Sequence, residues 1–173
     1  FEHPVLNDSK KLTARAREKI FAELQAAPGV LSAIVEVGIE EIDSLNILRA
    51  THEAMRRAVS ALPVCADHAI IDGLPVKPFP IPQTALVGGD GLSLSVAAAS
   101  VLAKVWRDMR MQALDAEYPQ YAFAKHKGYG TALHLERLRA HGVSPIHRRS
   151  FAPVRELSLG SESGLRADGE VAS

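Results

Sequence analysis

Two short apolar runs in the middle of the chain each give way to an aspartate among glycines. The first is AIIDG at residues 69–73, and the second is TALVGGDGLS at residues 84–93. The GLPVKPFPIP segment between them is rich in proline, which cannot donate to a strand ladder, so it predicts a surface crossover. We therefore expect two strands of one sheet, with Asp72 and Asp90 at neighbouring strand ends.

These two aspartates are the candidate catalytic and metal-binding residues of the chain. No basic residue in either segment neutralises Asp72 or Asp90, and carboxylate oxygens at a shared edge suit a divalent ion of the kind used in phosphoryl transfer. Taken singly, each has a plainer interpretation: Asp72 as a turn residue that accepts from nearby amides, and Asp90 as a cap of the next helix. The repetition of the pattern favours the metal site, and the plainer interpretations stay open.

The rest of the sequence alternates helix and strand patterns, which predicts an α/β domain with a mixed sheet flanked by helices. Thr13 and Thr131 are both expected to cap helices. The expected domain covers residues 1–156, and residues 157–173 are expected to form a disordered tail because they hold few large apolar side chains. The expected elements are a helix at 14–27, a strand at 30–37, a loop at 38–46, a helix at about 44–61, a long helix at 93–118 and a helix ending at 141–142.

Composition narrows the class of protein. The 173 residues are 47% hydrophobic with no apolar run long enough to span a membrane, and the single Cys65 excludes a disulfide framework. A cytoplasmic monomer is the expectation. The chain begins at Phe1 in a loop-like segment without Met, so we expect the natural protein to continue upstream.

One segment is markedly basic and is a candidate nucleic-acid surface. Residues 121–155 hold seven Lys or Arg and one Glu, together with Tyr121, Tyr129 and several histidines, a mixture that suits a polyanion or, equally, a solvated helical face. Tyr129 lies between two glycines, where an exposed ring could stack on a sugar or base. In the LNDSKKL loop, Ser9 and Lys10 could donate to a phosphate.

Taken together, these segments resemble type 2 ribonuclease H, the bacterial ribonuclease HII family. LNDSKKL, EIDSLNILRAT, IDG, the GD before the long helix, FAKHKGYGT and SPIHRRSF occur in the family's order between residue 5 and about residue 155. The resemblance implies an RNase H-like fold and cleavage of the RNA strand of RNA–DNA hybrids. It also implies incision at ribonucleotides embedded in duplex DNA, leaving a 3′-hydroxyl and a 5′-phosphate.

The same resemblance assigns roles to individual residues. Four carboxylates of the family hold two Mn²⁺ or Mg²⁺ ions, and Asp72 and Asp90 match the third and fourth of them. Tyr129 matches the tyrosine that senses the 2′-hydroxyl at an RNA–DNA junction, and Ser9 and Lys10 match the phosphate-contacting loop.

The sequence departs from the family at its start. The family opens with a strand ending in Asp-Glu-Val-Gly-Arg-Gly, and no such segment occurs here. We therefore expect the intact gene product to be a nuclease and the chain as written to be inactive or nearly so. The alternatives are a catalytically dead remnant that still binds hybrids, and an α/β module with two capped turns and no active site.

Overall fold

The computed structural model describes residues 12–164, which fall into two compact units. Of the described residues, 12–36 and 51–107 belong to unit 1, and 37–50 and 108–164 belong to unit 2. Among the described residues, no helix is long and apolar enough to cross a membrane.

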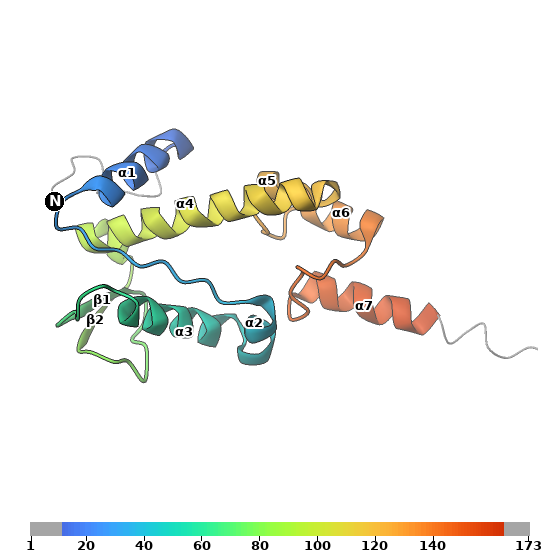
Figure 1. Cartoon of the computed structure of the whole chain (residues 1–173). Coiled ribbons are helices and arrows are strands. Elements are labelled where there is room, and N and C mark those ends of the chain that lie inside the picture. The colour runs from blue at the N-terminus through green and yellow to red at the C-terminus, as the bar shows by residue number, and fades with distance from the viewer. Residues whose placement is uncertain (1–11, 165–173) are drawn as a thin grey trace, which may run out of the picture. The chain divides into compact units, whose positions relative to one another are not determined.

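Unit 1 is built around two helices that share one apolar core. Helix α1 (Ala14–Ala26) begins at Thr13, whose Oγ1 accepts from the Ala16 amide at 3.2 Å, as predicted. Helix α1 lies alongside the first half of helix α4 (Leu94–Glu117) in Figure 1. Their contact is formed by buried apolar side chains of both helices and of the residue before α1: Leu12, Ile20, Leu24, Ala97, Val101, Leu102 and Val105.

The strand expected at residues 30–37 is not formed, so that prediction is wrong. Val30 and Ile34 pack against the core of unit 1, and the Trp106 indole N–H donates to the Glu36 carboxylate at 2.5 Å. The apolar pattern thus reflects burial only in part, because Val30 and Ile34 are partly buried whereas Leu31 is 51% exposed. A strand also needs a neighbouring backbone to pair with, and no other part of residues 12–164 pairs with this segment in a sheet.

The single helix expected at about 44–61 is two helices, α2 (Ile39–Leu45) and α3 (Ile47–Ser60). Asn46 breaks the run with a φ of 71° and a ψ of 162°, a backbone conformation that cannot continue a helix and that non-glycine residues rarely adopt. Its side-chain Oδ1 accepts from the amides of Leu48 and Arg49 at 3.0 and 3.1 Å, so Asn46 starts α3.

The sheet consists of two parallel strands, β1 (Ala69–Asp72) and β2 (Gln83–Leu86), which lie side by side in Figure 1. The proline-rich crossover between them is tied down by Gln83, whose side chain donates to the Val76 carbonyl at 2.7 Å and accepts from its amide at 2.9 Å.

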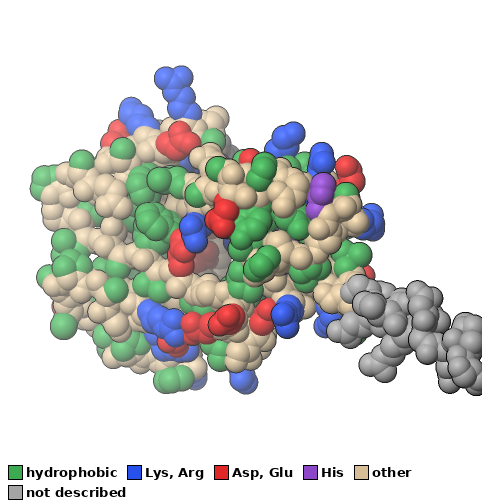
Figure 2. All heavy atoms as spheres, turned by 45° about the vertical axis from the view of Figure 1, so that its right-hand side comes forward, with side chains coloured by type: hydrophobic (Ala, Val, Ile, Leu, Met, Phe, Trp, Pro, Cys, Tyr) green, Lys and Arg blue, Asp and Glu red, His purple; other side chains and the backbone are tan. Residues whose placement is uncertain are grey.

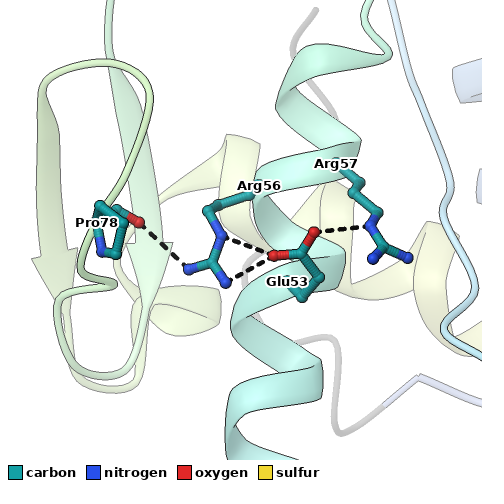
Figure 3. A network of polar contacts seen from close by, with 4 residues as sticks. All are labelled: Glu53, Arg56, Arg57 and Pro78. Carbon is teal, nitrogen blue, oxygen red and sulfur yellow. Dashed lines mark hydrogen bonds and ion pairs between the residues drawn. The ribbon is translucent and has the colours of Figure 1, made fainter. Parts of the chain in front are cut away.

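Helix α3 also holds this crossover, through a network of polar contacts. Figure 3 shows Arg56 between Glu53 and the Pro78 carbonyl, with hydrogen bonds of 2.7 and 2.9 Å to the carboxylate and 3.3 Å to the carbonyl. Arg57 occupies the other Glu53 oxygen at 2.8 Å.

Unit 2 is helical in its described C-terminal part. A short 3₁₀ turn at Pro119–Tyr121 precedes α5 (Phe123–His126), α6 (Ala132–His141) and α7 (Ala152–Gly164). The Oγ1 of Thr131 accepts from the His134 amide at 3.3 Å, as predicted for a cap. Buried Tyr121, Phe123, Leu138 and Val154 form the core.

Helix α7 continues to Gly164, past residue 156, where we expected the ordered part of the chain to end. Residues 157–164 are therefore helical rather than irregular, and the rest of the expected tail, 165–173, lies outside the described residues. The division of the chain into a catalytic domain and a tail stays a prediction.

Candidate functional site

The carboxyl ends of β1 and β2 meet at one edge of the sheet. The strands are parallel and Asp72 is paired with Leu86, so both chains leave the sheet in the same direction. The ladder continues one step further, because the Gly73 amide donates to the Leu86 carbonyl at 2.9 Å. The neighbouring strand ends are therefore present, with Asp72 at the end of β1 as predicted, whereas Asp90 lies in the 3₁₀ turn beyond β2 rather than at its end.

The Gly-Gly-Asp-Gly turn after β2 folds back against Asp72. The Gly89 amide donates to Asp72 Oδ1 at 2.9 Å, which couples the first aspartate to the residue before the second. Gly88 has a φ of 71°, which glycine adopts without strain. A Cβ on Gly89 would lie 3.2 Å from Val96 Cγ1 and 3.3 Å from Leu86 Cβ, so this close approach favours glycine.

The two aspartates differ in exposure. Asp90 lies in the 3₁₀ turn Gly89–Gly91 and is only 8% exposed, whereas Asp72 is exposed at the end of β1. Their donor chemistry fits Mg²⁺ or Mn²⁺, which prefer carboxylate oxygens. Within residues 12–164, no group of three or more His, Cys, Asp or Glu is arranged to hold a metal, so Asp72 and Asp90 offer at most part of a site.

Tyr129, in unit 2, presents an exposed side chain on a tightly held backbone. Its side chain is 56% exposed. Its amide donates to the His126 carbonyl at 2.9 Å, and its carbonyl accepts from the Thr131 amide at 2.8 Å and lies 3.0 Å from His134 Nδ1. The flanking glycines therefore do not make this a loose loop.

The structure explains why glycine occupies each position beside Tyr129. Gly128 has a φ of 77°, in the left-handed region. A Cβ on Gly130 would come within 3.2 Å of Phe151 Cζ, so glycine at this position allows the loop to pack against that ring.

Three histidines of the basic segment are buried, which corrects the expectation that they contribute to a polyanion surface. His126, His134 and His147 are 5%, 3% and 6% exposed, and Tyr121 is buried as well. The His126 and His134 rings stack at 4.1 Å, and the Nε2 atoms of His134 and His147 are 3.3 Å apart. Burial lowers the pKa of His134, and burial followed by the proximity of His134 lowers the pKa of His147 to about 4.

Sequence reasoning also missed Asp43, which lies in α2. Its carboxylate accepts from the amides of Arg149 and Ser150 at 2.8 and 2.9 Å and from the Ser150 hydroxyl at 2.5 Å. Burial alone would raise the pKa of Asp43, but these hydrogen bonds outweigh it and lower the pKa. The contact holds the basic loop that follows His147, and the aspartate in EIDSLN was the available signal.

The remaining candidates are less well defined. Ser9 and Lys10 lie outside the described residues. On the face shown in Figure 2, Lys and Arg side chains are interspersed with acidic and hydrophobic ones. The exposed basic residues of the 121–155 segment therefore remain candidates for nucleic-acid contacts as single residues.

Comparison with known proteins decides the family. The family model described as ribonuclease HII matches residues 2–154. The chain belongs to the ribonuclease HII family. The ribonuclease HII of Desulfitobacterium hafniense is 54% identical over 156 residues, covering 90% of this chain and 60% of that protein. The ribonuclease HII of Geobacillus kaustophilus is 52% identical over 159 residues, covering 92% and 60%.

The chain thus spans about 60% of the length of these first curated relatives. It covers 82% of the ribonuclease HII of Dechloromonas aromatica, at 52% identity over 161 residues. The crystal structure of ribonuclease H2 from Pyrococcus horikoshii matches with a TM-score of 0.75 and 23% identity, covering 95% of this chain and 83% of that one. This likeness confirms the α/β, RNase H-like fold class predicted from the sequence.

Proposed function

We propose that this ribonuclease HII chain forms part of an endonuclease that cuts the RNA strand of RNA–DNA hybrids and incises duplex DNA at embedded ribonucleotides. The observation that carries the proposal is the sheet edge where β1 and β2 end together and Gly89 bridges the turn to Asp72. Membership of the ribonuclease HII family supports the substrate class. Action as a cytoplasmic monomer remains our expectation.

Asp72 and Asp90 are proposed to contribute two ligands to Mn²⁺ or Mg²⁺ ions. When bound, such ions would supply an activated water and would stabilise charge on the leaving 3′-oxygen. The chain's own contribution is orientation: the Gly89 amide fixes Asp72 Oδ1, and burial within the 3₁₀ turn restricts Asp90. Two carboxylates cannot hold two ions in catalytic geometry, so we propose that the chain alone is inactive or nearly so.

Paramagnetic broadening by Mn²⁺ tests the metal site even where affinity is low. Amide signals of residues 72–73 and 89–90 should broaden first as Mn²⁺ is added to the chain. Asp72→Asn and Asp90→Asn should each weaken the effect, while Asp67→Asn, an exposed aspartate of the same unit, should not. Broadening that persists in both site variants would refute a metal site at this edge.

Tyr129 is proposed to contact the ribose 2′-hydroxyl of the substrate. Its exposed ring and hydroxyl on a fixed backbone support this role. In a protein of the relatives' full length, Tyr129→Ala should reduce cutting at a lone ribonucleotide far more than it reduces binding to plain duplex DNA. Equal losses on both would show that the tyrosine is structural.

A second candidate, a module that binds hybrids without cutting them, is favoured by the incomplete metal-ligand set of the described residues. The two candidates differ in full-length protein. Cleavage that requires Asp72 and Asp90 supports the nuclease, whereas hybrid binding that is unchanged by either substitution, without cleavage, supports the binding module.

A further inference from the structure

A buried series of hydrogen-bonded polar side chains ends at the backbone carbonyl of Tyr129. The series runs from Ser144 to His147, then to His134, and finally to the Tyr129 carbonyl. All three side chains in it are at most 9% exposed, so the chain is sealed from water over its length while the Tyr129 ring stays at the surface.

The backbone fixes the direction of hydrogen bonding in this chain. The Ser144 amide can only donate, and it lies 3.1 Å from His147 Nδ1, so that nitrogen must accept. A neutral His147 then carries its proton on Nε2 and donates to His134 Nε2 across 3.3 Å. His134 must accept at Nε2, which leaves its proton on Nδ1, 3.0 Å from the Tyr129 carbonyl.

The tautomer of the neighbouring His126 is fixed in the same way, and its ring packs against this series of side chains. The Gly128 amide donates to His126 Nδ1 at 3.2 Å, so Nε2 carries the proton and donates to the Tyr121 carbonyl at 2.8 Å. The His126 ring stacks on His134 with an interplanar angle of 10°. Phe123 and Phe151 also contact the His134 ring, at centroid distances of 6.0 and 5.9 Å.

We propose that His134, oriented by His147 and Ser144, is a positioning residue that fixes the Tyr129 backbone and thereby the direction of the Tyr129 ring. This rests on the proposed role of Tyr129 at the ribose 2′-hydroxyl. A donor at Nδ1 holds the carbonyl in place together with the Thr131 amide, and the Gly130 contact with Phe151 closes the loop from the other side. The chain of histidines thus sets selectivity for an RNA–DNA junction without touching substrate.

The proton positions give a direct test in the unsubstituted chain. Nitrogen-15 NMR of the histidine rings at pH 7.5 should show the Nδ1–H tautomer for His134 and the Nε2–H tautomer for His126 and His147. A proton on Nε2 of His134 would overturn the proposal, because that nitrogen must accept from His147 and Nδ1 would then have none to donate to Tyr129.

Two substitutions at His134 separate positioning from packing. His134→Phe keeps a ring for stacking but has no donor, whereas His134→Asn keeps a donor near the position of Nδ1 and loses the ring. In full-length enzyme, His134→Phe should lower the ratio of kcat/KM at a lone ribonucleotide to kcat/KM on a long hybrid by roughly tenfold, the effect of one lost hydrogen bond. His134→Asn should restore part of that ratio.

His141→Phe is the matched control, since His141 is an exposed histidine on the same helix, and it should leave the ratio unchanged. Equal loss on both substrates in His134→Phe would show a structural role only and would overturn the proposal. Failure of the proposed role of Tyr129 would give a different result from failure of the positioning proposal. In that case Tyr129→Ala would leave cutting at the junction intact, while the histidine tautomers would be as expected.

Discussion

Mild acid should destabilise unit 2 through its buried histidines. Burial and the nearby His134 lower the pKa of His147 from 6.5 to about 4, and the pKa of His134 is lowered in the same direction. The unfolded chain therefore binds protons more readily than the folded one. Stability contributed by neutral His147 is fully present above pH 6.5 and is lost as the pH falls toward 4.

The magnitude follows from the two pKa values. Their difference corresponds to up to about 3 kcal/mol for His147 over the whole range, of which about 2 kcal/mol falls between pH 7.5 and 5. Besides the other two histidines, His147 contacts the Ser144 hydroxyl and the rings of Tyr121 and Phe123. Asp43, with its lowered pKa, stays ionised throughout this window.

Urea unfolding at several pH values between 5 and 7.5 is the assay. All three tyrosines, Tyr118, Tyr121 and Tyr129, lie in unit 2, and the single Trp106 lies in unit 1, so their near-ultraviolet circular dichroism reports the two units separately. The tyrosine-detected free energy of unfolding should fall by about 2 kcal/mol on acidification. His147→Gln should be less stable at pH 7.5 but should flatten this dependence, whereas His141→Gln should keep it. A tyrosine transition that does not move with pH, or an equal slope in His147→Gln, would refute the reasoning.

Two further predictions concern the contacts that shape the site. Gly89→Ala should lower the stability of unit 1 by about 1 to 3 kcal/mol, because the new Cβ would press on Val96 and Leu86. Gly91→Ala should be nearly neutral, because a Cβ at Gly91 would meet open space. Thermal unfolding followed through Trp106 compares the two variants. Asp43→Asn should lower the stability of unit 2 by about 1 to 3 kcal/mol, because one of the three groups that donate to the carboxylate would lose its acceptor. Urea unfolding measures this change. A loss of stability no larger than that caused by Glu40→Gln, at an exposed position, would contradict this account.

The two-stranded sheet that ends at Asp72 could be predicted because its determinants are local in the sequence. Apolar runs ending at Asp72 and before Gly88, with prolines between them, imply two strands and a surface crossover, and both strands form as expected. The same local reasoning placed the caps at Thr13 and Thr131. Threonine side chains that accept from a backbone amide three residues ahead could be identified here from the sequence alone.

The two failed predictions have different causes, a missing distant strand partner in one case and a local side-chain cap in the other. Residues 30–37 have the composition of a strand, but composition does not supply the adjacent backbone that a ladder requires. Asn46 interrupts a helical pattern because its side chain satisfies the first amides of α3, an alternative that hydrophobic periodicity does not reveal.

The buried histidines show most clearly that contacts between distant residues cannot be inferred from composition. They also change the interpretation of Tyr129 beside them. From composition, a basic segment with histidines around Tyr129 indicates an open, flexible surface for a polyanion. In the structure, Ser144, His147 and His134 are joined end to end in the interior, and Gly130 packs against Phe151, so the loop is held by residues 5 to 22 positions after Tyr129 in the sequence. The fixed backbone of Tyr129 is therefore a property of tertiary packing, and in the proposed role at the ribose such a residue would lose less conformational entropy when substrate binds.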